Sequence, residues 1–209
     1  MGTDIHSVIQ VKTAHHGWVD VCNNVGDNRN YDTFAVYADV RSGYGFAGTD
    51  TGEGWTPISQ PRGFPEDFLV DGTNHIVKIP YRESSVDIWM GDHSYSWLLL
   101  SEIESAWDHF KDKFYEVHGV VDWGHFNETL AVGKQPQDWA ADVGGKSVVI
   151  CDQKDVTPTS KCTHVRCKWV VPCINRLSTM AAHMKLMQAI RDAEDLSSEN
   201  VRIVFGFDS

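Results

Sequence analysis

The chain has 209 residues, of which 42% are hydrophobic and 22% are charged. This composition is typical of a globular protein with one well-buried core and argues against extensive disorder. Acidic residues outnumber basic residues by 29 to 18, and the formal net charge is -11. Such a charge disfavours a long nucleic acid as partner, because duplex binding needs many cationic contacts to phosphates. Small anionic ligands are not excluded, since a few arginines in one cleft can override the average field.

The cysteines bear on the cellular compartment. There are five: Cys22, Cys151, Cys162, Cys167 and Cys173. An odd number, behind an N-terminus without a basic and apolar signal segment, favours a cytoplasmic protein with reduced thiols. Four of them lie near His164, so a zinc site is an alternative, but their spacing differs from the paired CxxC pattern. We expect buried thiols in and beside a strand, no bound metal and, without a run of 18 apolar residues, no membrane span. The cofactor, if any, is unknown.

The first half of the chain predicts a hairpin, a short helix and a loop. Residues 6–12 and 17–22 are rich in Val and Ile and predict two paired strands. Apolar residues at helical spacing predict a short helix from Tyr31 to near Arg41. The Gly- and Pro-rich segment 42–65 also carries many aromatic rings, so we expect a long ordered loop packed on the body. Further strands are expected at 76–79 and 86–90.

The second half predicts two helices and a closing strand. A helix is expected directly after residue 100, with the Ser101–Glu104 segment as its capping box. Residues 115–146 show an irregular pattern, whereas 148–151 and 164–171 read as strands. A long apolar stripe over 174–190 predicts a helix packed on a sheet, and 201–207 predicts a strand that joins the sheet of the first hairpin. We therefore expect one α+β domain over residues 1–209, with a mixed or mainly antiparallel sheet.

Two histidines each have an aspartate close in sequence. Asp4 stands two residues before His6, so both side chains would point to one face of an extended chain. Asp92 directly precedes His93 in the stretch 91–97, which combines an acid, an imidazole, hydroxyls and aromatic rings. A carboxylate can orient an imidazole and fix its tautomer, as acid–base catalysis requires. Two such histidines can cleave a phosphodiester without a metal: one takes the proton of a ribose 2'-hydroxyl and the other protonates the leaving oxygen.

Other side chains fit a phosphorylated nucleotide as the substrate. Arginine forks suit phosphates, and aromatic rings stack on bases. We expect the stretch 91–97 at a helix entrance, where the helix dipole favours anions. The predicted substrate-binding residues are Arg29, Asn30, Tyr31, Arg41, Arg62, Tyr95 and Trp97, with Trp55 as a further candidate for stacking.

Several alternatives stay open at this point. The two Asp and His pairs are also potential ligands of a metal that hydrolyses phosphate esters, although these short motifs are not specific. Ser94 is a third catalytic candidate, as a nucleophile beside His93, but it lacks the G-x-S-x-G elbow. The same arginines and rings would also suit a protein that binds a nucleotide without cleaving it. A structural or virion-assembly role is the remaining reading, and a homo-oligomer is possible under each.

An ordered set of motifs resembles a family of small, uncharacterised phage-encoded proteins. The motifs are Asp4-Ile5-His6, Arg29-Asn30-Tyr31, Val40-Arg41, Pro61-Arg62-Gly63, Asp92-His93-Ser94 with Ser96-Trp97, and the closing segment 201–208. The resemblance implies a phage protein acting in the cytoplasm of an infected bacterium. Small phage proteins include inhibitors of bacterial immunity, some of which cleave or sequester cyclic nucleotide signals. Our leading hypothesis is therefore an anti-defence phosphodiesterase that inactivates a small cyclic nucleotide, with sequestration as the alternative.

Overall fold

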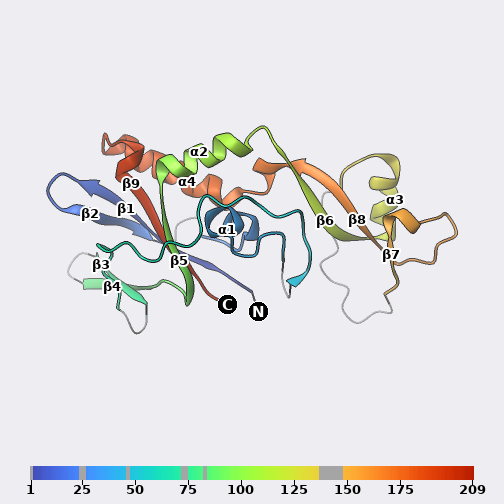
Figure 1. The fold of residues 1–209 in the computed structure, drawn as a ribbon, viewed down its shortest axis with the longest axis horizontal. Coiled ribbons are helices and arrows are strands. Elements are labelled where there is room, and N and C mark those ends of the chain that lie inside the picture. The colour runs from blue at the N-terminus through green and yellow to red at the C-terminus, as the bar shows by residue number, and fades with distance from the viewer. Residues whose placement is uncertain (1, 24–26, 46–47, 72–74, 82–83, 137–147) are drawn as a thin grey trace.

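The computed structural model describes residues 2–23, 27–45, 48–71, 75–81, 84–136 and 148–209. The fold class is α+β, as expected, and the strands pair mainly antiparallel (Figure 1). The strands are divided among three sheets, however, where one was expected. No helix within the described ranges is both long and apolar enough to cross a membrane.

A four-stranded sheet forms the centre of the molecule. Its order is β2-β1-β9-β5, and its strands are β1 (Ile5–Thr13), β2 (Gly17–Asn23), β5 (His93–Leu99) and β9 (Val201–Phe207). The predicted N-terminal hairpin is confirmed, and so is its pairing with the closing strand. β9 is antiparallel to both β1 and β5 and lies between them.

The two faces of this sheet are covered by different elements. Side chains alternate between faces along a strand. Thus Phe205 and Phe207 of β9 belong to the main core, whereas Val204 belongs to a second cluster on the opposite face. Every residue of β9 is buried, which explains why its sequence does not alternate between apolar and polar residues. Its one charged residue, Arg202, is bonded to Gln10 and Asp67.

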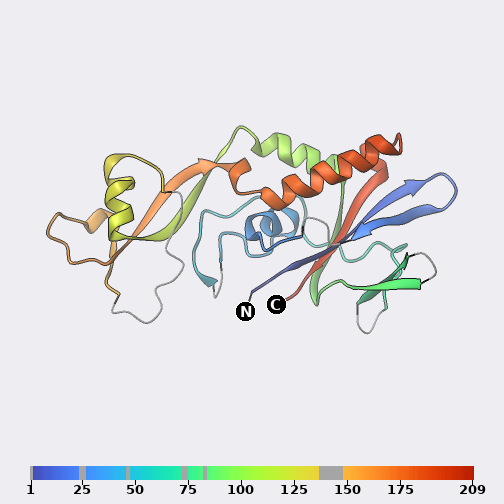
Figure 2. The ribbon, with the colours of Figure 1, turned by 180° about the vertical axis from the view of Figure 1, so that it is seen from behind.

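Three helices cover the face of the main core: α1 (Tyr31–Ala38), α2 (Leu100–Phe110) and α4 (Ser178–Ala193). Figure 2 shows α2 and α4 side by side along one side of the molecule. Asn30 caps α1, because its side-chain oxygen accepts the Thr33 N–H at 2.7 Å. α1 ends at Ala38, before the predicted Arg41, because Asp39 takes a left-handed conformation with φ 58°.

α2 starts at Leu100, close to the expected position, but the expected capping box of Ser101 and Glu104 is wrong. Glu102 accepts the N–H of Leu99 at 2.8 Å, whereas Glu104 binds Arg191 and Ser198 on the C-terminal part of the chain. The expected place of the stretch 91–97 at a helix entrance holds only for its last residues, because the stretch runs along β5, which leads directly into α2. Six residues, 94–99, separate His93 from α2, a distance of about 20 Å at roughly 3.3 Å per residue.

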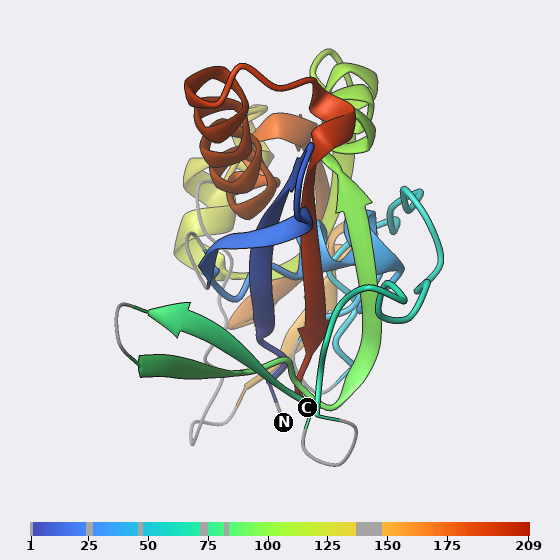
Figure 3. The ribbon, with the colours of Figure 1, turned by 90° about the vertical axis from the view of Figure 1, so that its left-hand side faces the viewer.

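The opposite face of the sheet carries the hairpin of β3 (Ile76–Tyr81) and β4 (Ser84–Trp89). Val77 and Ile88 lie opposite each other in this hairpin and are both buried. They pack in the second cluster with Val8 and Val204 of the sheet. The hairpin is thereby held against β1 and β9, and Figure 3 shows it at the same end of the sheet as the two chain ends.

A three-stranded sheet extends away from the helices (Figure 1). It consists of β6 (Phe114–Asp122), β8 (His164–Pro172) and β7 (Ile150–Asp152), and α3 (Trp123–Glu128) follows β6. The expectation of irregular structure over 115–146 is wrong for its described part, and residues 137–147 lie outside the described ranges. The overlooked signal is the period-two pattern of β6, which buries Tyr115, Val117 and Val121. Short 3-10 turns lie at Leu130–Val132, Gln153–Asp155, Cys173–Asn175 and Ser198–Asn200.

The expectation of five reduced thiols is wrong. Cys151 of β7 and Cys162 are joined in a disulfide, with their Cα atoms 5.8 Å apart, within the usual range for such a bond. Cys22, Cys167 and Cys173 are free. The zinc alternative thereby loses two of its four cysteines.

Thiol counting tests this disulfide. The denatured protein should show three reactive thiols without a reductant and five after reduction. The bond spans 11 residues of sequence, so its loss should lower the free energy of unfolding by up to about 3 kcal/mol in the chain-entropy view. Five reactive thiols without reductant, in protein purified under air, would contradict the bond.

Gly91 allows β5 to start close against the end of β9. It has φ 82°, and a Cβ placed on it would overlap the carbonyl group of Phe207. The next residue, Asp92, donates its N–H to that same carbonyl at 2.7 Å. A side chain at position 91 would therefore push residues 92 and 93 away from β9.

We predict that Gly91→Ala lowers the free energy of unfolding by at least about 1–3 kcal/mol, because it combines a strained φ with a backbone overlap. Denaturant unfolding measures the change. The control is Gly124→Ala in α3, where the added Cβ would meet only the Asp122 side chain at 3.2 Å; its effect should stay within about 1 kcal/mol. Equal stability of both variants would show that the close approach at Gly91 is unimportant.

Candidate functional site

The two predicted catalytic histidines both contact Asp208, directly after β9. His6 on β1 lies opposite Gly206, and His93 on β5 lies opposite Phe207. Nε2 of His6 is 3.3 Å from Oδ2 of Asp208, and Nε2 of His93 is 3.3 Å from the Asp208 main-chain oxygen. The sheet thus brings two distant histidines to one residue. Asp92 adds a carboxylate 4.0 Å from Nε2 of His93.

The strand register places the two imidazoles on opposite faces of the sheet. His6 shares its face with Gly206, whereas His93 stacks on Phe207, on the face of the main core, at 6.0 Å between ring centroids. Both rings are partly accessible, with 20% of the His6 side chain and 36% of the His93 side chain exposed. A molecule in contact with both must therefore pass over the end of β9 at Asp208.

The hydrogen bonds of His93 determine where it carries a proton. A main-chain oxygen only accepts, so Nε2 must carry the hydrogen that it donates to Asp208. Nδ1 lies 2.9 Å from Oγ of Ser94, and in the neutral ring it accepts a hydrogen bond from the Ser94 hydroxyl. Ser94 has φ 52°, a left-handed conformation that a non-glycine residue rarely adopts. Strain of this kind is often found at functional sites.

His6 forms a dyad with the Asp208 carboxylate. Because a carboxylate is an acceptor, Nε2 of His6 donates to it, and among the described residues Nδ1 has no hydrogen-bond partner. The second carboxylate oxygen, Oδ1, accepts the N–H of Asp4 at 2.7 Å. The carboxylate is therefore held from two sides and can orient the imidazole, as in the His–Asp pairs of acid–base enzymes.

Arg29 and Asp4 form the cationic side of this cluster. Nε and Nη2 of Arg29 bind the two carboxylate oxygens of Asp4 at 2.9 and 2.6 Å. The hydrogen bonds from Arg29 lower the pKa of Asp4 below its usual value. The Arg29 side chain is still 53% exposed, so a ligand phosphate can reach the guanidinium.

Tyr31 and Arg41 are connected to the same end of the sheet through Thr3. The Tyr31 hydroxyl accepts the Thr3 N–H at 3.3 Å, and Nε of Arg41 donates to Oγ1 of Thr3 at 2.9 Å. The Arg41 guanidinium lies over the Tyr31 ring at 5.3 Å. These predicted binding residues therefore adjoin the cluster one residue before Asp4.

The other predicted binding residues have structural contacts. Asn30 caps α1 and donates to the main-chain oxygen of Arg176 at 2.9 Å. Arg62 forms a bidentate ion pair with Glu102 at the start of α2 and covers the Trp97 ring at 4.8 Å. Trp55 is buried and stacks on Tyr115, so it cannot stack on a base.

Tyr95 lies nearer to the histidines, but its polar end is occupied. The absence of a side chain at Gly206 leaves room for the Tyr95 ring. The Tyr95 hydroxyl is 2.5 Å from Nδ1 of His75 and donates to the carbonyl of Gly91 at 3.0 Å. Its ring stacks on Phe64 at 4.3 Å.

Sequence reasoning missed two residues of the cluster, Asp208 and Trp89. In the sequence, Asp208 is only the last residue of the closing segment 201–208. A carboxylate one residue beyond a central strand is nevertheless well placed for contact with both neighbouring strands. Trp89 ends β4, and its ring centroid is 4.8 Å from that of His6. The residues around Trp89 carry no pattern that predicts its contact with His6, more than eighty positions earlier in the chain.

A second His–Asp pair, also unforeseen, is enclosed in the core. His183 on α4 is fully buried and bonds Asp27 through Nε2 at 2.8 Å and Tyr37 through Nδ1 at 3.2 Å. Asp27 also accepts the Ser7 hydroxyl at 2.7 Å. Because His183 has no exposed surface, we assign this network a structural role in tying β1, α1 and α4 together. Among the described residues, Oδ2 of Asp27 is buried without a hydrogen-bond partner.

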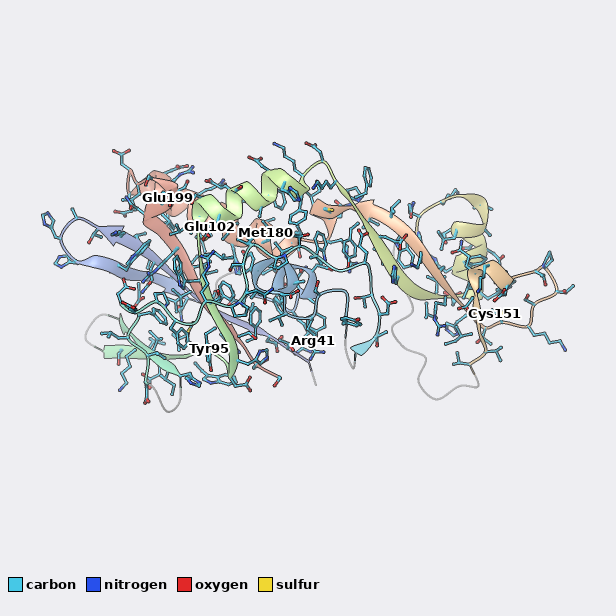
Figure 4. All side chains as sticks on the ribbon, viewed as in Figure 1. Arg41, Tyr95, Glu102, Cys151, Met180 and Glu199 are labelled. Atoms are coloured by element: carbon cyan, nitrogen blue, oxygen red, sulfur yellow. A yellow bond between two sulfur atoms is a disulfide. The ribbon has the colours of Figure 1, made fainter. Side chains whose placement is uncertain are left out.

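Two adjoining cavities, of about 580 and 280 Å³, lie beside α2. They share Thr56, His109 and Phe110, and Glu102 and Glu199 line the larger one. Figure 4 places these two glutamates at one end of β5 and β9 and Tyr95 toward the other. We assign the candidate site to the histidines because proton-transfer groups in mutual hydrogen bonds are found there.

No group of three or more His, Cys, Asp and Glu side chains within the described ranges is arranged to hold a metal ion. Comparison of the chain with known protein families, with curated proteins and with solved structures found no match.

The Arg29–Asp4 pair makes stability depend on pH. Because the pKa of Asp4 is lowered from 3.8 in the folded protein, the pair stabilises the fold above about pH 3.8 and loses its effect as the pH falls through the lower, folded pKa. Asp4→Asn should therefore reduce the free energy of unfolding at pH 7 and have a smaller effect near pH 2. Urea unfolding at both pH values measures this, with the exposed Asp112→Asn as control. The same loss at both pH values would contradict an electrostatic role.

Proposed function

We propose that the protein binds a small cyclic nucleotide over the end of β9 and inactivates it by cleaving a phosphodiester bond. The observation that carries the proposal is the shared contact of His6 and His93 with Asp208. Two imidazoles held by one residue, both partly exposed, are a suitable acid–base pair. Their position on opposite faces favours a ligand with two nucleotide units over a mononucleotide, because the ligand must extend across the strand end.

Each histidine has a role that fits its hydrogen bonds. Nδ1 of His6 takes the proton of a ribose 2'-hydroxyl, while the Asp208 carboxylate stabilises the resulting imidazolium through Nε2. The 2'-oxygen attacks the adjacent phosphorus. His93, in its protonated form, gives a proton to the departing 5'-oxygen. The products are a 2',3'-cyclic phosphate and a free 5'-hydroxyl, so neither an oxidant nor an added nucleophile is needed.

The cationic groups of the cluster offset most of its carboxylate charge. The cluster contains the carboxylates of Asp4, Asp92 and Asp208, and Arg29 and Arg41 offset two of them. The third carboxylate, that of Asp92, lies 4.0 Å from Nε2 of His93, so the proton that His93 carries in this mechanism offsets it. Among the described residues, Arg29 is best suited to contact a phosphate, because its guanidinium is exposed. Its planar fork can bind phosphate oxygens while keeping one hydrogen bond to Asp4.

The resemblance to small phage-encoded proteins supplies a biological setting. In that setting the substrate is a cyclic nucleotide signal of bacterial immunity, and the protein acts in the infected cell. Sequestration without cleavage uses the same residues as binding contacts. Acid–base groups in mutual hydrogen bonds favour cleavage over sequestration, because a binding protein does not need them.

The test is a turnover assay with mass spectrometry. Purified protein is incubated with cyclic dinucleotides and ADP-ribose-derived signals, with and without EDTA, and the filtrate is analysed before and after heating. Wild type in EDTA should convert a cyclic dinucleotide into a linear product of the same mass but a different chromatographic retention time, because no water is added. A second cleavage should give nucleoside 2',3'-cyclic phosphates of half that mass. His6→Gln, His93→Gln and Asp208→Asn should each lower the rate by about 10²- to 10⁴-fold. His16→Gln, in the exposed turn between β1 and β2, is the matched control and should be fully active.

Each alternative gives a different result. Ligand that disappears from the filtrate and returns unchanged on heating would establish sequestration and reject cleavage. Product formation that is lost in EDTA would replace the histidine mechanism with a metal. Unchanged rates in both His6→Gln and His93→Gln would reject the assigned roles, and a protein that ignores every nucleotide in the panel would reject the function.

A further inference from the structure

Trp89 presents an indole at the edge of the histidine cluster. It is the last residue of β4, and its side chain is 43% exposed. Tryptophan is usually much more buried, because its ring contributes a large apolar surface. The exposed part of the ring faces the solvent beside His6, with an angle of 54° between the two ring planes.

The backbone holds Trp89 firmly in this position. Its neighbours Ile88 and Met90 are 5% and 0% exposed and pack in the second core cluster. The N–H of Met90 donates to the His75 carbonyl at 3.0 Å. An exposed ring on an anchored backbone is well suited to binding, because little conformational freedom is lost when a ligand stacks on it.

The residues around His6 form a continuous chain of contacts in space, from a cation to an aromatic ring. Arg29 binds Asp4, whose N–H binds the Asp208 carboxylate. That carboxylate binds His6, and the His6 ring contacts Trp89. The Arg29 guanidinium therefore lies at one end of this chain of contacts and the Trp89 indole at the other, with the His6 imidazole between them. A nucleotide has the same arrangement of groups, with an anionic phosphate and an aromatic base on either side of the ribose.

The other aromatic side chains near the site are engaged. Tyr31 lies under the Arg41 guanidinium, Tyr95 stacks on Phe64, and Trp97 lies under Arg62. Among the described aromatic residues, Trp89 combines a large exposed ring with direct contact to His6.

We propose that Trp89 is the base-stacking residue of this site and determines its preference for purine nucleotides. The base lies on the exposed indole, and the ribose is then next to His6, with its phosphate toward Arg29. A purine covers the two-ring indole more fully than a pyrimidine does. This inference rests on the proposed function, because it assigns the base-recognition residue of the same site.

Equilibrium dialysis tests the proposal with three probes: a cyclic dinucleotide of adenine, the corresponding dinucleotide of uracil, and ribose 5-phosphate, which has no base. Binding is measured with the 2'-deoxy forms of both dinucleotides, which lack the attacking hydroxyl and stay intact, and cleavage is measured with the ribose forms. Wild type should bind the adenine compound more tightly than the uracil compound. Trp89→Ala should weaken adenine dinucleotide binding by about 5- to 100-fold and leave binding of ribose 5-phosphate unchanged. Val86→Ala, an equally exposed position on β4, is the matched control and should bind like wild type.

Trp89→Phe keeps an aromatic ring and guards against misfolding of the alanine variant. It should bind with intermediate affinity and lack the fluorescence quenching that the adenine dinucleotide causes in wild type. Wild-type affinity in Trp89→Ala, in a protein that still cleaves the dinucleotide, would overturn the role of Trp89 and leave the proposed function intact. A wild type that neither binds nor cleaves any probe would overturn both.

Discussion

The pairing of β9 between β1 and β5 is the interaction on which the structure depends. It buries every side chain of β9, separates the main core from the second cluster, and fixes the register of both histidine-bearing strands. Because β1 and β5 run in the same direction on either side of β9, their first residues meet its last. His6, His93 and Asp208 are therefore brought together by the sheet, and Gly91 allows the close approach that this requires.

Much of the fold can be predicted from the sequence, since the N-terminal hairpin is rich in Val and Ile, α2 has apolar residues at helical spacing, and β9 is a mostly apolar segment. The alternation in β6 is hard to recognise, because Gly119 interrupts its buried set of residues and Phe114 and Val120 are apolar residues in the other set. The Cys151–Cys162 bond could not be predicted, because cysteine spacing does not determine pairing. Asp4, His6, Asp92 and His93 could be selected from local pairing of imidazole and carboxylate. The role of Asp208 depends on strand register across almost the whole chain, which local patterns do not contain.

Charge compensation separates the predicted arginines into two groups. Arg62 is bound to Glu102 and to the carbonyl of Trp97, so its guanidinium stabilises the start of α2. Arg29 has an equally good partner in Asp4 but retains an exposed surface. The sequence alone does not distinguish these two arginines. Their surroundings do, because Arg62 stabilises the fold and Arg29 is accessible to an anion. The overall charge of -11 therefore does not describe the field at this end of the sheet.

The contact between His6 and Asp208 joins residues 202 positions apart in sequence, and this separation has a consequence for folding. Closing so large a loop is entropically costly, and folds dominated by such distant pairings form slowly. Until β9 takes its place, one edge of β1 and one edge of β5 remain unpaired and can associate with other chains. A partly folded molecule would contain both histidines without the carboxylate that orients one of them, so the proposed activity and completion of the sheet should appear in the same kinetic step.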